Sequence, residues 1–549
     1  MTDGARSEPG LRRALPSLLL LAFLLPDLWL AEPGWVRLGW VVLVTVATAW
    51  LLSREDLERA LQPLASPRRF HAFVAAWIVA GITLSLVRYA AFGDVLAYDT
   101  AYHVQVLWNT LHGRTLEGSL LQSLHFDPPL RNHFGLHVSP TFVALLPVFA
   151  VAPGYGVLLV VKVVASGLAA LPLYALARRS LGEAAAFLVG AAYLLHPTVL
   201  AQTTHAFYPV VLVAPLLMGA LWAWEVRRPV LFALLCAGAL GVREDVGLVL
   251  AAFFGVGLLE HLVSPERRRP VAWWLLPPLV GLAWYVVCVR FVMPAVGGSS
   301  SSQSVLSWYA GFGESPGAII ARIVTDPLYT LGVIFTGAKV LYVWQLLRPW
   351  ALLSVLGIPS LVALPSLAVN LLVTRPNPGT IHPTEHYSVT IAVALAAGAV
   401  AALVVVRRRY GDRAALVAAV LATACSMSSV TDVFSKSELA RLSPPAHASA
   451  LREALARVEK GTTVSAPGYI VAHVATSPQV WASDRIGHYP EFRPQWALFD
   501  RDTTRFYLQE RAEPKYRARL ARFEQDPGYE IVLDRDDIVL FRRRGAADR

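Results

Sequence analysis

The sequence has few charged residues for its length. Only 16% of the 549 residues are Asp, Glu, Lys or Arg and 55% are hydrophobic, whereas soluble proteins usually carry about a quarter charged residues. A water-soluble fold could not bury so much apolar surface. Runs such as 35–52, 72–92 and 271–292 are apolar and have about the 20 residues needed to cross a bilayer. We therefore expect an α-helical polytopic membrane protein.

Cysteine is also scarce, and several common motifs are missing. The three cysteines, Cys236, Cys288 and Cys425, lie inside apolar runs without a CxxC pair, so no disulfide framework is indicated. The chain has no P-loop, no GxGxxG after a strand and no GxSxG elbow, the usual signatures of nucleotide-driven transport and hydrolase chemistry. The net charge of +10 comes largely from short loops beside the apolar runs, which indicates membrane topology and not nucleic-acid binding.

Clusters of Lys and Arg mark the cytoplasmic side of membrane proteins and orient this chain. These clusters are Arg12/Arg13, Arg68/Arg69, Arg178/Arg179, Arg227/Arg228, Arg267 to Arg269 and Arg407 to Arg409. Placing them inside gives a cytoplasmic N-terminus and puts a long loop, 93–137, outside. The first apolar run, 14–30, lacks a small-residue cleavage site, so we interpret it as a retained helix. This scheme predicts about 13 membrane-spanning helices in the inner, cytoplasmic membrane.

Changes in composition divide the chain into three predicted domains. Residues 1–70 form two additional membrane helices, 71–434 form the multi-spanning domain, and 435–549 form a small soluble α/β domain outside the membrane. In the last domain, apolar periodicity predicts a helix at 448–458, a strand at 462–466 and a hairpin at 530–542 that turns at 535–537.

Two membrane segments, 138–152 and 328–347, are less regular than the others. Residues 138–152 are expected to be short or re-entrant, because the charge pattern allows one crossing between 140 and 177. We expect spanning helices at 328–347, which Lys339 interrupts, and at 349–372.

Five polar segments interrupt the apolar sequence, and the proposed topology carries all of them to the outer side. They are 98–103, 133–137, 205–208, 243–245 and 382–387. Ionisable groups at membrane helix ends are costly unless they face a cavity or a partner, so their gathering indicates a functional site. The alternative is that loops simply contain polar residues. The candidate site residues are Tyr98, Asp99, His103, His133, His137, His205, Tyr208, Arg243, Glu244, Asp245, His386 and Tyr387.

A divalent metal is one possible ligand for these residues. Asp99 and His103 are four apart and share a helix face, so they can bind one metal or substrate group, or form a structural pair. The run from Arg243 to Asp245, in a tight hairpin, either neutralises itself or binds a substrate or cation. Asp99, His103, Glu244 and Asp245 are compatible with a metal, although their spacing matches no HExxH or other tight ligand motif.

These segments resemble the membrane-protein family known as domain of unknown function 2079. The matching residues are Tyr98-Asp99 through Trp108-Asn109, the HFGLHVSP run at 133–140, His205 to Pro209, Arg243-Glu244-Asp245 and His386-Tyr387. The resemblance covers roughly residues 70 to 540. Arg243 stands where the family is expected to have Lys, which preserves the charge and changes the donor geometry. The two N-terminal helices look like an addition.

That family in turn resembles the GT-C glycosyltransferases, multi-spanning enzymes that use lipid-phosphate-linked sugars. The resemblance implies a polyprenyl-phosphate sugar donor, a soluble outer C-terminal domain and a catalytic acidic residue in the first outer loop, where Asp99 stands. Asp99 would accept the proton of the acceptor hydroxyl. Arg243, with Arg131 or a protonated His137 as further candidates, would stabilise the departing phosphate.

Two other functions remain open. In a transporter or lipid flippase the same charges would line a pathway that helices broken by Gly and Pro would gate. A pathway requires polar groups that continue to the cytoplasmic side, whereas here they concentrate on one side, which favours the enzyme. In a non-catalytic scaffold, whose C-terminal domain binds a partner, neutral replacement of Asp99 and Glu244 would affect nothing beyond stability.

Overall fold

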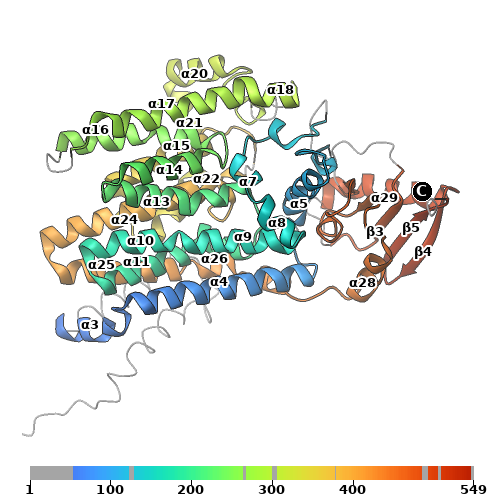
Figure 1. The fold of residues 1–549 in the computed structure, drawn as a ribbon, viewed down its shortest axis with the longest axis horizontal. Coiled ribbons are helices and arrows are strands. Elements are labelled where there is room, and N and C mark those ends of the chain that lie inside the picture. Colours follow the sequence, from blue (N-terminus) through green and yellow to red (C-terminus); the bar gives the residue numbers. More distant parts are fainter. Residues whose placement is uncertain are drawn as a thin grey trace, which may run out of the picture.

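In the computed structural model the chain forms a long helical domain with a smaller α/β domain at one end (Figure 1). The structure describes residues 54–94, 96–122, 129–263, 268–298, 306–376, 379–484, 493–504 and 509–545. The two additional membrane helices predicted before residue 70 fall within residues 1–53, outside the described part of the chain.

Six helices are long and apolar enough to cross a membrane. They are Pro67–Ala90, Tyr155–Leu181, Val246–Val263, Val271–Gly297, His386–Tyr410 and Asp412–Val433. Counting each of two bent helix pairs as one span raises the number to eight. The chain is therefore a multi-pass helical membrane protein. The predicted number of about 13 spans is not confirmed, because four other apolar helices in the described residues have only 10 to 17 residues.

Most of these spans are built from consecutive elements. They comprise α4 (Pro67–Ala90), α9 (Tyr155–Leu168) with α10 (Ala170–Leu181), α15 (Val246–Ala251) with α16 (Phe253–Val263), α17 (Val271–Val287) with α18 (Met293–Gly297), α24 (Val389–Tyr410), and α25 (Asp412–Met427) with α26 (Val430–Val433). The shorter elements between them are α3 (Arg54–Leu61), α5 (Ala97–Leu111), α6 (Ser119–Gln122), α11 (Glu183–Leu195), α12 (Pro197–Leu200), α13 (Val213–Glu225) and α14 (Pro229–Leu240).

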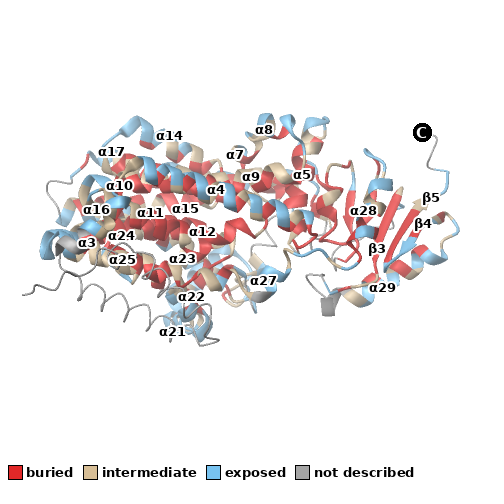
Figure 2. Cartoon of the chain, turned by 90° about the horizontal axis from the view of Figure 1, so that it is seen from below, coloured by how far each residue is buried: buried red, intermediate tan, exposed pale blue. Residues whose placement is uncertain are grey.

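The outer surface of the helical domain is apolar, as expected for a protein in contact with lipid tails. Large hydrophobic side chains on α17, among them Leu276, Leu279 and Val280, are more than half exposed. Figure 2 shows the exposed positions along the outer helices and the buried ones between them. Such a surface would aggregate in water and is stable in a bilayer.

Helix α24 lies at the centre of this domain, and small residues let its neighbours approach closely. Its sequence is rich in Ala and contains Gly398, and most of its residues are buried. A Cβ added at Gly398 would lie 1.8 Å from the Ser360 side chain, and one at Gly357 would lie 2.0 Å from the Gly398 carbonyl. Close backbone contact of this kind is typical of helix interfaces in membranes.

The predicted single helix at 328–347 is wrong. The chain there forms α20 (Pro316–Thr325) and α21 (Pro327–Ile334), bent by 100°, and then α22 (Gly337–Leu347). The break between α21 and α22 is stabilised by Lys339, whose ammonium group donates to the carbonyls of Val333, Leu371 and Val373 at 2.6 to 2.8 Å. The charged residue that interrupts the apolar run thus satisfies the backbone groups freed by the break.

The predicted helix at 349–372 is also wrong over most of its length. The segment consists of three short 3₁₀ helices, η7 (Arg348–Trp350), η8 (Leu353–Leu356) and η9 (Ile358–Ala363), followed by α23 (Leu364–Leu371). Ala351 and Leu352 adopt φ values of 48° and 62°, which end the first of these turns because an α-helix requires negative φ. The prolines within this segment also remove backbone donors.

Residues 138–152 form two short helices, α7 (Pro140–Val143) and α8 (Leu146–Val151). Together they are shorter than the roughly 20 residues needed to cross a bilayer. The prediction of a short or re-entrant segment fits this arrangement, and the chain then continues through α9 and α10.

The C-terminal domain contains a five-stranded sheet in the order β2-β1-β3-β5-β4. Its elements are α27 (Lys436–Ala440), α28 (Ala448–Arg457), β1 (Val464–Ala466), η12 (Val471–His473), β2 (Val480–Ala482), β3 (Trp496–Asp500), α29 (Gln509–Gln525), β4 (Tyr529–Arg535) and β5 (Ile538–Arg543). Strand β1 is parallel to β2 and β3, and β5 is antiparallel to β3 and β4. The predicted helix, first strand and hairpin are confirmed, with Asp536 and Asp537 at positive φ in the turn.

The two domains are joined through α5 and α6. The Ser119 hydroxyl of α6 donates to the Val480 carbonyl at 2.7 Å and accepts from the Val480 amide at 2.8 Å. The Gln105 side chain of α5 contacts the Ser477 carbonyl at 3.5 Å, and the Tyr89 ring stacks on His473 with centroids 4.3 Å apart. Helix α5 therefore packs against the C-terminal domain near one end and carries Asp99 near the other.

Candidate functional site

The five polar segments meet at the end of the helical domain that carries the C-terminal domain. The Tyr208 hydroxyl donates to Asp99 Oδ2 at 2.7 Å, and the His386 ring stacks on Tyr208 with centroids 3.6 Å apart. His137 Nδ1 lies 2.9 Å from Glu244 Oε1. We refer to the residues joined here as the polar cluster: Asp99, His137, Tyr208, Arg243, Glu244, Asp245, Glu385, His386 and Tyr387.

Asp99 lies in the first turn of α5, where the helix dipole favours a negative charge. Its partner Tyr208 is positioned by two contacts of the preceding segment. The Phe207 amide donates to the Thr100 hydroxyl at 2.7 Å, and the His205 carbonyl accepts a hydrogen bond from Lys162. Both Asp99 and Tyr208 are half-buried, so the pair is fixed by the fold and still accessible.

Glu244 connects two loops. Its Oε1 faces His137, and its Oε2 accepts from the Val138 amide at 3.0 Å. The Thr141 amide also donates to the Gly241 carbonyl at 2.7 Å. Glu244 is 7% exposed. Both of its oxygens therefore hold the 137–141 segment against the hairpin that carries Arg243.

Arg243 and Asp245 form a bidentate ion pair. Arg243 Nε donates to Asp245 Oδ1 at 2.6 Å, and Nη2 donates to Oδ2. The two side chains are 14% and 31% exposed. Arg243 Nη1 makes no hydrogen bond within the described residues, and Arg243 interacts electrostatically with His386 and Tyr387. Asp245 thus neutralises the charge of Arg243, and the Nη1 group of Arg243 keeps its hydrogen-bond donors near the cluster.

Glu385 is a site residue that the sequence did not single out, although it lies in one of the five polar segments. It is half-buried beside Asp99. Burial, and secondly the charge of Asp99, raise the pKa of Glu385 to about 7. A carboxyl group that keeps its proton to near neutral pH beside a second carboxyl group is typical of sites that move protons.

Three predicted site residues lie behind the cluster. The buried Tyr98 hydroxyl donates to the Leu120 carbonyl, and the fully buried His133 lies between Tyr102 and Ser139. His103 Nδ1 bonds to the backbone carbonyl of Asp99 at 2.6 Å and not to its carboxylate. Burial lowers the pKa of His103 to about 3, so the ring is neutral at physiological pH.

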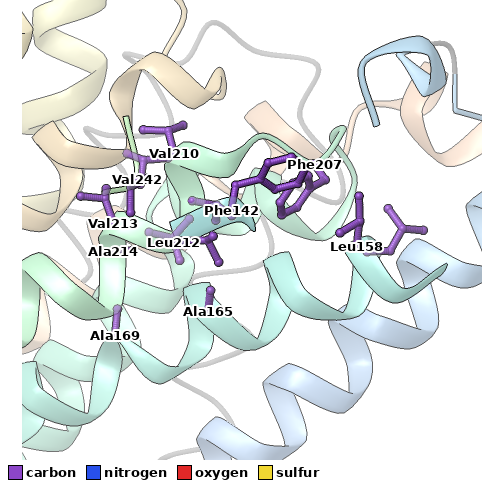
Figure 3. Packing of buried hydrophobic residues seen from close by; sticks show 14 of the residues in the cluster. Phe142, Leu158, Ala165, Ala169, Phe207, Val210, Leu212, Val213, Ala214 and Val242 are labelled. Atoms are coloured by element: carbon purple, nitrogen blue, oxygen red, sulfur yellow. The ribbon is translucent and has the colours of Figure 1, made fainter. Parts of the chain in front are cut away.

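Aromatic rings support the histidines of this layer. The His103 ring lies 5.3 Å from Phe142 and 5.6 Å from Phe207, in edge-to-face geometry. Figure 3 shows Phe142 and Phe207 side by side beneath this region. His103 is therefore a packing residue under Asp99, which agrees with the structural alternative for this i,i+4 pair.

The remaining candidates lie at the margin of the cluster. His205 is half-buried, with its ring nitrogen 3.1 Å from the Ala201 carbonyl. Arg131 is exposed, and within the described residues its side chain makes no contact with the cluster. Lys162 and Asp94, which the sequence analysis missed, are buried and interact electrostatically beneath His205. A charged residue inside the apolar run of α9 was the signal for Lys162.

The described residues contain no group of three or more His, Cys, Asp or Glu arranged to hold a metal ion. The four suggested ligands are separated by their partners: Asp99 is bound by Tyr208, His103 by a backbone carbonyl, Glu244 by His137 and Asp245 by Arg243. The structure does not bring Asp99, His103, Glu244 and Asp245 together as a metal site.

A cavity of about 500 Å³ lies between α21, α22, the segment 373–375 and Ile381. Its walls include Val333, Ala338, Ile381 and Arg375. The Arg375 guanidinium lies over the Trp308 ring at 5.2 Å, and that ring lies 5.7 Å from Tyr387. The cavity therefore combines apolar walls with a cation close to the polar cluster.

Comparison with solved structures finds several matching chains, among them two proteins of low sequence identity. ArnT from Cupriavidus metallidurans, with undecaprenyl phosphate bound, is 13% identical with a TM-score of 0.47, over 85% of this chain and 98% of ArnT. The archaeal oligosaccharyltransferase AglB from Archaeoglobus fulgidus, in complex with an inhibitory peptide and a dolichol-phosphate, is 14% identical with a TM-score of 0.38, over 75% of this chain and 65% of AglB. At TM-scores below 0.5 these similarities do not establish a common activity.

Comparison with curated protein sequences finds no match. A family profile, described as predicted membrane protein (DUF2079), matches residues 94–540, which include every residue of the polar cluster. This confirms the family indicated by the polar motifs. The chain belongs to the DUF2079 family of predicted membrane proteins.

Proposed function

We propose that this protein is a membrane glycosyltransferase that transfers a sugar from a polyprenyl-phosphate carrier to an acceptor hydroxyl at the outer face of the cytoplasmic membrane. The observation that carries the proposal is that the fold brings an accessible carboxylate, Asp99, and the guanidinium of Arg243 into one half-buried cluster, in which Tyr387 interacts electrostatically with both. The resemblance of the DUF2079 family to the GT-C glycosyltransferases supports it.

Asp99 is the proposed general base. As the acceptor oxygen attacks the anomeric carbon, its proton moves to the Asp99 carboxylate and the bond between sugar and phosphate breaks. The phosphate departs with the bonding electrons and carries the negative charge. Tyr208 holds Asp99 through Oδ2, so the carboxylate is pre-oriented for this step.

Arg243 is the proposed partner of the departing phosphate. Its Nη1 donors are not used within the described residues, and the pair with Asp245 fixes the direction of the guanidinium. A fixed donor directed at developing charge stabilises a transition state more than a mobile one does. The cavity beside Arg375 offers apolar walls for the lipid part of the carrier.

The proposed topology places the N-terminus in the cytoplasm and the C-terminal domain, 435–549, outside as a soluble unit. In this arrangement the polar cluster faces the outer interface, where a polyprenyl carrier presents its head group. A transporter is less well supported. At the remote end of the helical domain the buried pair of Glu260 and Arg269 is closed off by Trp224 and does not continue a polar path.

The test is transfer of radiolabelled sugar from a panel of polyprenyl-phosphate donors by membranes containing the wild type, Asp99→Asn or the control Asp536→Asn. Asp536 lies in an exposed turn of the C-terminal domain. We expect the wild type and the control to transfer sugar and Asp99→Asn to lose roughly a hundredfold or more. Equal transfer by all three would remove Asp99 from the reaction.

A further inference from the structure

A second candidate binding site lies at the end of the helical domain remote from the C-terminal sheet, the end at which α3 and α25 lie in Figure 1. A cavity of about 360 Å³ opens there between the ends of α10 and α24. It is lined by Ser180, Val404, Arg407, Arg408, Gly411 and Asp412. Arg407 pairs with Asp412 and donates to the Ser180 carbonyl, so it fixes the wall between the two helices.

A second, mostly apolar crevice lies next to the cavity. This narrow space between α10, α13, α16 and α24 shares Ser180 and Val404 with the cavity. Leu176, Leu221 and Val400 are among the walls of this crevice. Glu225 and Glu260 also line it, and the buried Arg269 offsets them, by an ion pair with Glu260 and a 3.8 Å approach to Glu225.

Two guanidinium groups at this site have no protein counter-ion. Arg408 lines the cavity and Arg179 lines the crevice, and both side chains are exposed. Neither makes a hydrogen bond or ion pair with any residue in the described ranges. Guanidinium donors match the geometry of phosphate oxygens, and basic pockets between membrane helices bind anionic lipid head groups.

We propose that this site binds an anionic phospholipid, with the phosphate between Arg179 and Arg408 and the first part of an acyl chain in the crevice between α10 and α24. The charge complementarity selects an anionic head group, and the position of the apolar crevice next to the cavity, with Ser180 and Val404 lining both, selects a lipid over a free phosphate. This inference does not depend on the proposed glycosyl transfer.

The experiment is native mass spectrometry of the full-length protein in detergent with equal amounts of phosphatidylglycerol and phosphatidylcholine of identical chains. We expect the wild type to retain phosphatidylglycerol in preference to phosphatidylcholine. In the double variant Arg179→Gln/Arg408→Gln the ratio of retained phosphatidylglycerol to phosphatidylcholine should fall about tenfold. Arg228→Gln, which removes an exposed arginine outside both spaces, is the matched control. Equal retention of the two lipids by the wild type, or an unchanged preference in the double variant, would overturn the proposal.

Two further measurements separate the head group from the chain. Ala401→Trp fills the crevice without changing charge, and it should weaken retention of phosphatidylglycerol by several fold. Glycerol 1-phosphate should not displace the lipid at millimolar concentration. Unaltered retention in Ala401→Trp, or full displacement by glycerol 1-phosphate, would show that the site does not hold a lipid chain.

Discussion

Two of the regions in the helical domain that hold buried or half-buried charges differ in access. At the remote end Glu260 and Arg269 are 3% and 4% exposed at their side chains and pair directly. Trp224 covers them: its indole donates to Glu260 at 3.1 Å, and the Arg269 guanidinium lies over its ring at 4.6 Å. In the polar cluster the Arg243 and Asp245 side chains remain 14% and 31% exposed.

The difference separates a structural charge pair from a candidate reactive one. The side chains of Glu260 and Arg269 are buried, so the two charges neutralise each other and stabilise the packing of α13 and α16. In the polar cluster Asp99, Arg243 and Asp245 each pair with a neighbour and stay partly accessible, whereas Glu244 is buried. A charged residue inside a membrane domain therefore indicates a functional site only when its side chain is accessible and has hydrogen-bonding groups that its neighbours do not use.

The largest expected effect on stability comes from the remote pair. Glu260→Gln removes the direct counter-ion of the buried Arg269 and leaves the more distant Glu225 beside it, so we expect a loss of about 3 kcal/mol in the free energy of unfolding. Thermal unfolding in detergent, with the exposed Glu459→Gln as control, measures it. A melting temperature equal to that of the wild type would show that this pair is not structural.

The next effect is on the rate and comes from the polar cluster. Arg243→Gln removes the guanidinium proposed to stabilise the phosphate, so we expect sugar transfer to fall about a hundredfold. Arg243→Lys keeps the charge and should lose only a few fold. The melting temperature of both variants should stay close to the wild-type value, because the pair is half-exposed. Equal transfer by Arg243→Gln and Arg243→Lys would exclude a role for this charge.

The smallest effect is a pH dependence. Because the pKa of Glu385 is raised to about 7, its neutral form prevails below pH 7 and its charge appears as the pH rises through that value. A second negative charge beside Asp99 repels the phosphate, so transfer by the wild type should fall up to tenfold between about pH 6 and 8. Glu385→Gln stays neutral and should remove this decrease.

The pH profile has a control within the same cluster. Since the folded state raises the pKa of Glu385, its contribution to stability is also full at low pH and is lost as the pH rises through about 7. Measuring the rate per folded molecule separates this loss from the effect on transfer. An alkaline decrease that persists in Glu385→Gln would assign it to another group.

The sequence was sufficient for features that depend on local pattern. Apolar runs located the long helices, and the alternation at 530–542 predicted the hairpin of β4 and β5. The predicted helices at 328–347 and 349–372 were wrong because hydropathy does not report a helix break that is stabilised by distant groups. Lys339 satisfies carbonyls on another element, at Leu371 and Val373, and this contact is invisible to a sequence window.

The sequence predicted which segments contribute to the candidate site, but it did not predict which side chains pair with one another. Asp99 and Tyr208 are 109 residues apart, and His137 and Glu244 are 107 apart, so only the fold shows which groups meet. His103 and His133 looked equivalent to His137 in the sequence, but burial separates them from the cluster. Glu385 was overlooked because its importance arises from its proximity to Asp99.

The most direct test measures transfer rate and stability together in Asp99→Asn and Glu260→Gln, with the rate expressed per folded molecule. We expect Asp99→Asn to keep the wild-type melting temperature and its transfer rate to fall at least a hundredfold. Glu260→Gln should melt at a lower temperature and keep the wild-type rate per folded molecule. If both variants lost rate and stability in parallel, the distinction between an enclosed structural pair and an accessible reactive cluster would be contradicted.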